Sequence, residues 1–299
     1  MPKIRIAMKH KAGFVNIIGH PNVGKSTLMN QLVGEQLSII TSKAQTTRHR
    51  ILGIVNEENY QIVYSDTPGI IDPAYKMQEG MMKFVYSSLK DADIILLMLE
   101  CGQQKLKDDR LNDFLNKTEV PVIILINKID LSQQDKLEIE MNRWHEQLPK
   151  ASILPLSALH AFNVDSLKQK IIELLPESPP YYPKDSLTDK SERFFVEEKI
   201  REKILLLYDQ EVPYSAEVEV ESFKDEEDIL KIRAIIYVSR ESQKGIIIGK
   251  EGRMLKKVGS SARKDLEEFF QKKIYLELYV KVNKDWRNDE NQLKRFGYL

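Results

Sequence analysis

Short runs of apolar residues alternate with amphipathic stretches along the first part of the chain. The apolar runs occupy residues 13–19, 51–56, 60–66, 93–100, 120–128 and 152–158. Four of them are continuously apolar, which is typical of strands buried on both faces of a sheet. Between the runs, the spacing of apolar residues predicts helices near residues 77–90, 106–116, 131–147 and 164–175. This alternation predicts an α/β domain with a mostly parallel six-stranded sheet and helices on both of its faces.

A proline-rich segment interrupts the alternation after residue 175. Four prolines fall between residues 176 and 183, and proline is excluded from helix interiors and central strands. We therefore predict an extended linker over residues 179–190, which separates a domain of residues 1–178 from a second domain of residues 191–299.

The second domain shows a different order of elements. The pattern predicts a helix, two strands, two helices joined by a glycine-containing loop, and a last strand. These elements lie near residues 191–208, 214–222, 229–239, 242–270 and 274–282. An acidic run, Lys224–Asp228, falls between the two strands and is predicted to form their hairpin tip. The order predicts a smaller α+β domain.

A glycine-containing loop follows the first predicted strand and precedes a predicted helix. Its sequence, GHPNVGKS over residues 19–26, fits a phosphate-binding P-loop in the strand–loop–helix context that the motif requires. Gly19 and Gly24 would let backbone N–H groups turn towards phosphate oxygens. Lys25 would neutralise phosphate charge, and the hydroxyl of Ser26 would bind Mg²⁺. The other nucleotide-binding residues predicted in and beside this loop are His20, Pro21, Asn22, Val23 and Thr27.

Two further motifs predict which base is bound. In NKID, residues 127–130, Asp130 would accept hydrogen bonds from guanine N1–H and the exocyclic amine, a donor pair that adenine lacks. Asn127 would hold the other edge of the base. In SAL, residues 157–159, the N–H of Ala158 would lie near the guanine oxygen. The motifs together predict GTP rather than ATP, bound by Asn127, Lys128, Ile129, Asp130, Ser157, Ala158 and Leu159.

A DTPG motif ends the third predicted strand, at residues 66–69. Asp66 would lie beside the Mg²⁺ ion, and the N–H of Gly69 would contact the γ-phosphate. The nucleotide-binding residues predicted here are Asp66, Thr67, Pro68, Gly69 and Ile70.

The polar segment before this strand, residues 43–50, is predicted to be a switch loop that reaches over the γ-phosphate. Either Thr46 or Thr47 would complete the Mg²⁺ ligands, and we favour Thr47. The predicted switch residues are Gln45, Thr46, Thr47, Arg48 and His49. The predicted metal-binding residues are Ser26, Thr47 and Asp66, and the predicted catalytic residues are Lys25, Thr47, Gly69 and Asn22.

Composition restricts the remaining functions. The chain of 299 residues has 45 basic and 45 acidic residues, so a nucleic-acid surface would have to be a local basic patch. The single cysteine, Cys101, cannot form an internal disulfide, which fits a reducing compartment. The N-terminal residues lack the apolar core of a signal peptide, and the sequence leaves open whether translation starts at Met1 or Met8.

A local basic patch surrounds GKEG, residues 249–252, in the second domain. Residues 244–264 contain seven basic residues and one acid, Glu251. A G-x-x-G loop between two helices lets a nucleic-acid backbone approach closely, as in KH domains. The apolar residues Ile246, Ile247 and Ile248 would line the groove beside the loop or belong to the core. The predicted RNA-binding residues are Lys244, Ile248, Gly249, Lys250, Glu251, Gly252, Arg253, Lys256 and Lys257.

The motifs of the first domain and the order of elements in the second resemble the Era family of ribosome-associated GTPases. The resemblance rests on GHPNVGKSTLMNQL, QTTRHR, DTPG, NKID and SAL, and on a type II KH domain with GKEG and the C-terminal run around Trp286. It implies GTP hydrolysis with Mg²⁺, binding near the 3′ end of 16S ribosomal RNA, and assistance to assembly of the small ribosomal subunit. It also implies a cytoplasmic monomer with a peripheral contact at the inner face of the cell membrane.

The resemblance also leads to expectations about the rate of hydrolysis. Ile70 stands where Ras-like enzymes place a water-positioning glutamine, so we expect slow intrinsic hydrolysis. Relatives with asparagine in the P-loop and a Thr-Thr-Arg switch bind K⁺ near the phosphates, and Asn22 matches that asparagine. The alternative is that Asn22 only stabilises its own turn.

Three other functions compete with this interpretation. One is an RNA chaperone whose GTP site only stabilises the fold. Another is a GTPase that acts through a protein or membrane partner, with the KH-like domain as a docking module. An ATP-dependent kinase is disfavoured because it would leave NKID unexplained. In the favoured mechanism, GTP and Mg²⁺ order the loop containing Thr46 and Thr47 and the DTPG segment, and this change makes the RNA-binding face available.

Overall fold

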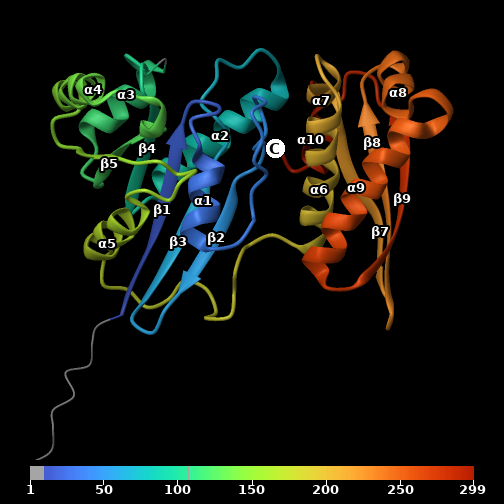
Figure 1. The fold of residues 1–299 in the computed structure, drawn as a ribbon, viewed down its shortest axis with the longest axis horizontal. Helices are drawn as coiled ribbons and strands as arrows, with labels where there is room; N and C mark the ends of the chain where they lie inside the picture. The colour runs from blue at the N-terminus through green and yellow to red at the C-terminus, as the bar shows by residue number, and fades with distance from the viewer. Residues whose placement is uncertain (1–9, 107) are drawn as a thin grey trace, which may run out of the picture. The chain divides into compact units, whose positions relative to one another are not determined.

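The structure is a computed structural model of the chain and describes residues 10–106 and 108–299 (Figure 1). The alternative start at Met8 lies outside the described residues. The chain forms two compact units. The first runs to Ile40 and includes Thr47–Asp72 and Met82–Asp189. The second consists of Lys190–Leu299 together with the short segments Thr41–Thr46 and Pro73–Met81.

A six-stranded sheet forms the centre of the first unit. Its strands are β1 (Lys11–Gly19), β2 (Ile51–Asn56), β3 (Tyr60–Asp66), β4 (Ile94–Glu100), β5 (Val122–Asn127) and β6 (Ser152–Pro155). They lie in the order β2-β3-β1-β4-β5-β6, and only β2 is antiparallel to its neighbour. Residues 94–99 of β4 are all fully buried, as expected for a central strand covered on both faces. The predicted mostly parallel sheet is confirmed.

Helices cover both faces of this sheet (Figure 1). They are α1 (Lys25–Val33), α2 (Lys76–Lys90), α3 (Asp109–Lys117), α4 (Gln134–Gln147) and α5 (Val164–Leu174). One apolar cluster joins α3, α4 and the Met82–Lys90 part of α2 to one face, whereas α1 and α5 pack together on the other. The helix predicted from residue 106 begins only at Asp109, because the side chain of Asp108 caps it by accepting a hydrogen bond from Leu111 N.

The segment predicted as a linker packs against the first unit instead of extending freely. Ile54 N donates to Leu187 O over 2.8 Å, and the Thr188 hydroxyl donates to Leu52 O over 2.7 Å. The amide oxygen of Gln61 accepts from the backbone N–H groups of residues 181 and 182. These bonds hold the proline-rich segment beside strands β2 and β3, so the first unit extends to Asp189 and not only to residue 178.

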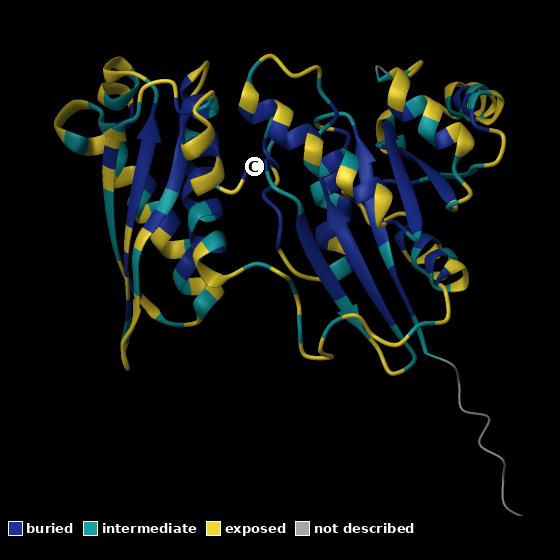
Figure 2. Cartoon of the chain, turned by 180° about the vertical axis from the view of Figure 1, so that it is seen from behind, coloured by how far each residue is buried: buried dark blue, intermediate teal, exposed yellow. Residues whose placement is uncertain are grey.

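The second unit is an α+β domain built on a three-stranded sheet. Its elements are α6 (Glu192–Leu207), α7 (Val212–Ser215), β7 (Glu217–Asp225), β8 (Ile229–Val238), α8 (Glu241–Ile248), α9 (Arg253–Phe270), β9 (Lys273–Val282) and α10 (Glu290–Arg295). β8 lies in the centre, antiparallel to β7 and parallel to β9. Apolar residues of α6, α8 and α9 form one core with the sheet, and Figure 2 shows the buried strand faces. The predicted order of elements in this domain is confirmed.

Two parts of the second unit differ from the prediction. The strand expected from residue 214 starts at Glu217, because Pro213 lies in the first turn of the short helix α7. The C-terminal run contains the unpredicted helix α10, which Asp289 caps by accepting a hydrogen bond from Gln292 N. In the part of the chain that the structure describes, every helix is too short or too polar to cross a bilayer.

Candidate functional site

The predicted phosphate loop connects β1 to α1 at the carboxyl edge of the parallel strands. Three of its residues have positive φ angles, namely Gly19 (154°), Asn22 (64°) and Gly24 (104°). A Cβ atom on Gly19 would lie 2.2 Å from Met98 O, and one on Gly24 would lie 2.3 Å from the Asn127 side chain. Both positions therefore require glycine. His20, Pro21 and Val23 complete the loop, and Thr27 lies in the first turn of α1.

Lys25 is buried at the start of α1, and its ammonium group points back into the loop. Its Nζ donates to Gly19 O over 3.1 Å and to His20 O over 2.9 Å. Burial lowers the pKa of Lys25 to about 8, and the carboxylate of Asp66 partly opposes this change. A phosphate group bound here would restore the stability of the charged form, because it would place negative charge beside a buried ammonium.

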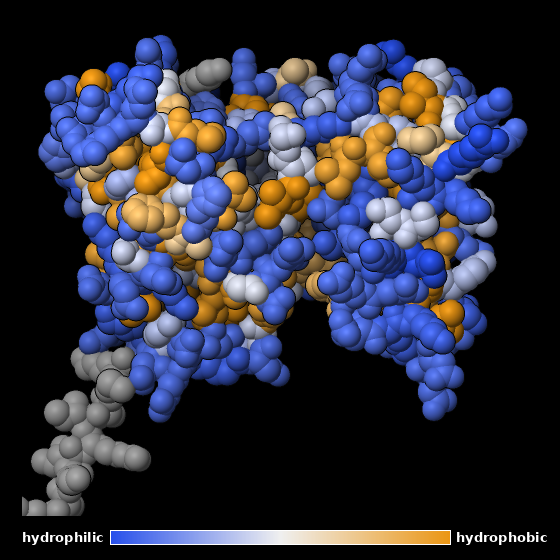
Figure 3. Space-filling view, in the orientation of Figure 1, coloured by the Kyte–Doolittle hydropathy of each residue, from blue (hydrophilic) through white to orange (hydrophobic). Residues whose placement is uncertain are grey.

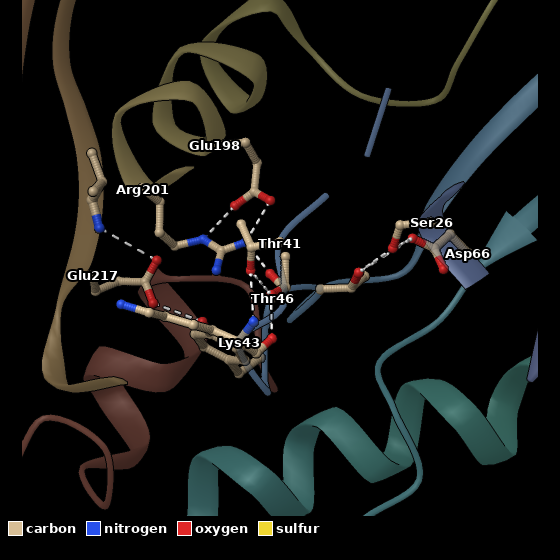
Figure 4. Close-up of polar contacts among 11 residues, drawn as sticks. Ser26, Thr41, Lys43, Thr46, Asp66, Glu198, Arg201 and Glu217 are labelled. Atoms are coloured by element: carbon tan, nitrogen blue, oxygen red, sulfur yellow. Dashed lines mark hydrogen bonds and ion pairs between the residues drawn. The ribbon is translucent and has the colours of Figure 1, made fainter. Parts of the chain in front are cut away.

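Three oxygen-bearing side chains converge next to this lysine, and Figure 4 labels two of them, Ser26 and Asp66. The Ser26 hydroxyl donates to Asp66 Oδ2 over 2.8 Å and lies 2.9 Å from Thr47 Oγ1. Thr47 Oγ1 in turn lies 3.2 Å from Asp66 Oδ2. Asp66 is fully buried, and its Oδ1 has no hydrogen-bond partner among the described residues.

This oxygen cluster fits a Mg²⁺ ion. Burial raises the pKa of Asp66, while Lys25 and the surrounding hydroxyls oppose that change. A divalent cation beside the carboxylate would stabilise its ionised form. Hydroxyl and carboxylate oxygens are the ligands that Mg²⁺ prefers. The structure brings together all three residues that the sequence predicted for the metal: Ser26, Thr47 and Asp66.

The residues predicted to recognise the base meet at the ends of β5 and β6. Asn127 is buried, donates from Nδ2 to Val23 O over 2.7 Å and accepts at Oδ1 from Ala158 N over 2.9 Å. It thereby joins the phosphate loop to the SAL motif. Asp130 stays exposed, and Ser157 donates to its Oδ1 over 2.5 Å. This hydrogen bond is the main cause that lowers the pKa of Asp130, so the carboxylate is ready to accept from a guanine.

The remaining residues of NKID and SAL lie around the predicted base-binding position. Lys128 has a positive φ of 62°, and its ammonium pairs with Glu100 over 3.0 Å. Ile129 begins a 3₁₀ turn, Ile129–Leu131, while Leu159 is exposed.

The DTPG segment lies against the phosphate loop. A Cβ atom on Gly69 would lie 2.7 Å from Pro21, and Ile70 N donates to Gly19 O over 3.0 Å. Thr67 donates from its hydroxyl to Ile17 O over 2.8 Å. Ile70 is buried, so its side chain packs in the core and offers no polar group to a water.

The predicted switch loop divides between the two units. Gln45 and Thr46 belong to the second unit, and Thr47, Arg48 and His49 to the first. The Thr46 hydroxyl bonds inside its own loop, to Thr41 Oγ1 and to Lys43 O, both over 2.6 Å. Only Thr47 reaches the side chains of Ser26 and Asp66. The geometry therefore distinguishes the two threonines that the sequence left as alternatives.

In the second unit, the predicted RNA loop connects α8 to α9. It forms a 3₁₀ turn over Lys250–Gly252, and Gly249 (71°), Glu251 (55°) and Gly252 (73°) all have positive φ angles. Gly249 needs to be glycine, since a Cβ atom there would lie 2.7 Å from the Met254 side chain. Gly252 has open space, with nothing within 4 Å of a Cβ atom. The loop thus exposes its backbone to an approaching polymer.

Exposed basic residues surround this loop and continue along α9. Lys250, Arg253, Lys256 and Lys257 are exposed, and Lys244 is half-buried. Figure 3 shows mostly hydrophilic side chains over α9. Glu251 pairs with Arg253 over 2.6 Å, which removes part of the positive charge near the loop.

The three isoleucines before the loop have three different environments. Ile247 is fully buried in the core, Ile248 packs against that core, and Ile246 is half-exposed. Of the two alternatives that the sequence left open, the core applies to Ile247, because the helical turn of α8 points the three side chains in different directions.

Sequence analysis missed one group of polar residues, which lies in the second unit. Arg201 of α6 is 1% exposed and donates to Thr46 O over 2.5 Å. Glu198 accepts two hydrogen bonds from the same guanidinium, over 2.7 and 2.6 Å. An ion pair three residues apart on a helix usually lies on the surface, so the sequence carries no signal that this pair is buried.

Comparison with known proteins gives results for each unit and for the whole chain. Residues 14–128 match a family described as 50S ribosome-binding GTPase, and residues 211–287 match the KH domain. GTPase Era of Thermoanaerobacter sp. (strain X514) is 46% identical over 97% of this chain and 97% of its own length. GTPase Era of Alkaliphilus metalliredigens (strain QYMF) is 46% identical over 97% of this chain and its full length.

A solved structure resembles the chain over both units. It is a crystal structure of Era in complex with MgGDPNP and nucleotides 1506–1542 of 16S ribosomal RNA. The TM-score is 0.92 at 40% sequence identity, and the match covers 97% of this chain and 99% of the other.

Proposed function

Because the chain belongs to the Era family of GTPases, we propose that it is a switch that binds and hydrolyses GTP with Mg²⁺ and binds 16S ribosomal RNA. The observation that carries this proposal is the convergence of Ser26, Thr47 and Asp66 beside the buried Lys25. The solved relative bound to MgGDPNP and 16S ribosomal RNA combines the same two ligand classes.

In the first unit, the residues have separate tasks. Backbone N–H groups of the phosphate loop and Lys25 bind the phosphates, and Asn127 with Asp130 orients the guanine. Ser26, Thr47 and Asp66 would hold Mg²⁺, which neutralises charge on the β- and γ-phosphates when bound. Gly69 would sense the γ-phosphate through its N–H. These tasks require the switch loop and the DTPG segment to be ordered together.

Hydrolysis is slow without help, because Ile70 cannot orient a water. We propose that K⁺, bound by the side-chain oxygen of Asn22, accelerates hydrolysis. Hydrolysis should be several-fold faster in KCl than in NaCl, as a cation near the phosphates stabilises charge in the transition state. The control variant Asn22→Gly keeps the positive φ of 64° but removes the amide, so its rates in the two salts should converge. Equal rates for the unmodified chain would exclude this role.

In the second unit, the GKEG loop and the exposed lysines of α9 bind single-stranded RNA by backbone contacts. We propose that the bound RNA segment is the 3′ end of 16S ribosomal RNA. We further propose that the chain acts in the cytoplasm, on the small ribosomal subunit during its assembly. We also propose that it acts as a monomer and touches the inner face of the membrane peripherally.

The experiment that tests this function is fluorescence anisotropy with an RNA of nucleotides 1506–1542 of 16S ribosomal RNA and a scrambled control. Each RNA is titrated with the chain bound to GDP or to GDPNP. We expect tighter binding of the specific RNA with GDPNP, by about 5-fold or more, which is the usual lower range of coupling between two sites.

Two other outcomes would contradict parts of the proposal. Equal, salt-sensitive binding of both RNAs would mean that the basic surface binds phosphates without this target. Failure to bind any RNA would favour the alternative in which the KH domain docks on a protein or membrane partner.

A further inference from the structure

The switch loop is held by a buried arginine of the second unit. By its packing, Thr41–Thr46 belongs to the second unit, although Thr47 belongs to the first. Arg201 of α6 donates from Nη2 to Thr46 O over 2.5 Å, and Figure 4 shows its guanidinium between Glu198 and the threonine. This hydrogen bond connects a helix of the second unit to the last residue before Thr47.

The buried guanidinium of Arg201 has few other hydrogen-bond acceptors. Its side chain is 1% exposed, and that of Glu198 is 9% exposed. Glu198 accepts from Nε and Nη2, while Nη1 has no partner among the described residues. A buried guanidinium is costly unless its donors are paired. Among the described residues, Thr46 O is the one acceptor of Arg201 that does not lie on α6 itself, so this contact contributes strongly to the position of the loop.

The loop is also held at a second point, and hydrogen bonds link its residues between the two. Lys43 donates from Nζ to Tyr208 O and pairs with Asp209 over 2.9 Å, at the C-terminal end of α6. Inside the loop, Lys43 N donates to Thr41 Oγ1 over 3.1 Å, and the hydroxyls of Thr41 and Thr46 bond to each other. The loop therefore presents Thr46 O in one orientation.

The orientation of the Thr46 carbonyl also determines the orientation of the Thr47 N–H. A peptide unit is planar, so the Thr46 carbonyl and the Thr47 N–H share one plane. Only the backbone and side-chain torsions of Thr47 remain between that plane and its hydroxyl. The same hydroxyl lies 2.9 Å from Ser26 Oγ and 3.2 Å from Asp66 Oδ2. A hydrogen bond that orients the Thr46 carbonyl therefore restricts the orientations open to Thr47 through their shared peptide plane.

We propose that Arg201, held by Glu198, is a positioning residue for Thr47, by which the RNA-binding unit favours the Mg²⁺·GTP state of the switch loop. This inference rests on the proposed function, because it assumes that Thr47 binds the metal. It predicts a selective effect, since GDP lacks the γ-phosphate that the switch loop contacts. Loss of the arginine weakens GTP binding and Mg²⁺ binding without weakening GDP binding.

The test uses the full chain and two variants that remove the hydrogen bond. Arg201→Met alone leaves a buried carboxylate unpaired, so the double variant Glu198→Leu/Arg201→Met replaces the ion pair by apolar residues of similar volume, a change that folds usually tolerate. The matched control is Arg193→Met, because Arg193 lies on the same helix and donates to Val220 O over 3.3 Å, away from the switch loop. Thermal unfolding of each variant checks the fold.

The measurements are affinities for fluorescent GDPNP and GDP at a series of Mg²⁺ concentrations. For the double variant we expect GDPNP affinity to fall about 10-fold, the size typical of a charge-assisted hydrogen bond. The Mg²⁺ concentration for half-saturation should rise, and GDP affinity should change less than about 2-fold. Arg193→Met should leave all three values unchanged.

Each other result overturns the inference. Equal losses for GDP and GDPNP would mean that the pair only supports the fold. Unchanged or tighter GDPNP binding would mean that Arg201 does not favour the state with Thr47 at the metal. A wild-type chain that binds neither nucleotide would overturn the proposed function itself, and this outcome is distinguished from the others because it does not depend on the variants.

Discussion

Two glycine loops, one in each unit, have the same local design and opposite surroundings. The phosphate loop and the GKEG loop both precede a helix and both hold glycines at positive φ, 104° for Gly24 and 73° for Gly252. Around Gly24 the space is filled, since a Cβ atom would lie 2.3 Å from Asn127 Nδ2. Around Gly252 nothing lies within 4 Å of that point. At the glycine that precedes each helix, the two loops therefore differ in packing and not in backbone conformation.

This difference matches the size of the ligand that each loop is proposed to bind. A nucleotide is small enough to be enclosed, so the phosphate loop is fixed by neighbouring motifs, and its Lys25 is buried. An RNA strand is long and must be approached from outside, and the GKEG loop accordingly exposes Lys250 and Glu251. Exposed charges are screened by salt and buried charges much less. A closed loop gives specificity for one ligand, and an open one gives access to a polymer.

The largest expected effect comes from adding a methyl group to each loop. Alanine at either position pays a similar cost for its left-handed backbone, about 1–2 kcal/mol. Gly24→Ala also collides with the Asn127 side chain, which joins the phosphate loop to the base-binding motif. We expect GDP affinity to fall at least about 100-fold in Gly24→Ala, because the loop and the base site both shift. Calorimetric titration of both variants with GDP measures this effect.

Gly252→Ala is the matched control, since it carries the backbone cost without a collision. Its GDP affinity should equal that of the unmodified chain, and its RNA affinity should fall only a few-fold. If the two variants lost GDP affinity equally, the collision at Gly24 would add nothing to the backbone cost that both positions share, and the comparison would be wrong.

Much of this arrangement could be predicted from the sequence, because local patterns determine it. Continuous apolar runs such as residues 94–99 predicted the central strands, and motif order predicted that Ser26 and Asp66 would meet at one edge of the sheet. Motif spacing is informative there because parallel strands end together. The same reasoning found the helices on each side of GKEG.

The rest depends on contacts between residues far apart in sequence, which periodicity does not encode. The prolines predict an extended linker, but Gln61 and the edge of β2 provide partners for the backbone of this segment. The sequence predicts the helix that contains Arg201 but no role for this residue, because its partner Thr46 lies 155 residues away. Predicting that contact would require the packing of the second unit, and no pattern within α6 indicates it.

A smaller effect, on pH dependence, sharpens the contrast between buried and exposed loops. Burial lowers the pKa of Lys25 to about 8. Bound phosphates favour the ammonium and therefore raise its pKa in the complex. Below about pH 8 the lysine is charged both before and after binding, so GDP affinity should be flat. Above about pH 8 binding must take up a proton, and affinity should fall by up to about tenfold per pH unit.

Calorimetry of GDP binding from about pH 7 to pH 9, in buffers of different ionisation enthalpy, measures both the affinity and the proton uptake. Guanosine, measured by competition, is the matched ligand because it shares the base but lacks the phosphates that Lys25 contacts. Its affinity should not acquire this dependence, so subtracting its pH profile removes any contribution of the base and of Asp130. A GDP affinity that stays level through pH 9, without proton uptake, would show that Lys25 keeps its charge before the phosphates arrive. The phosphate loop would then hold a charged lysine as readily as the exposed GKEG loop does. Burial would therefore not explain the difference between the two loops.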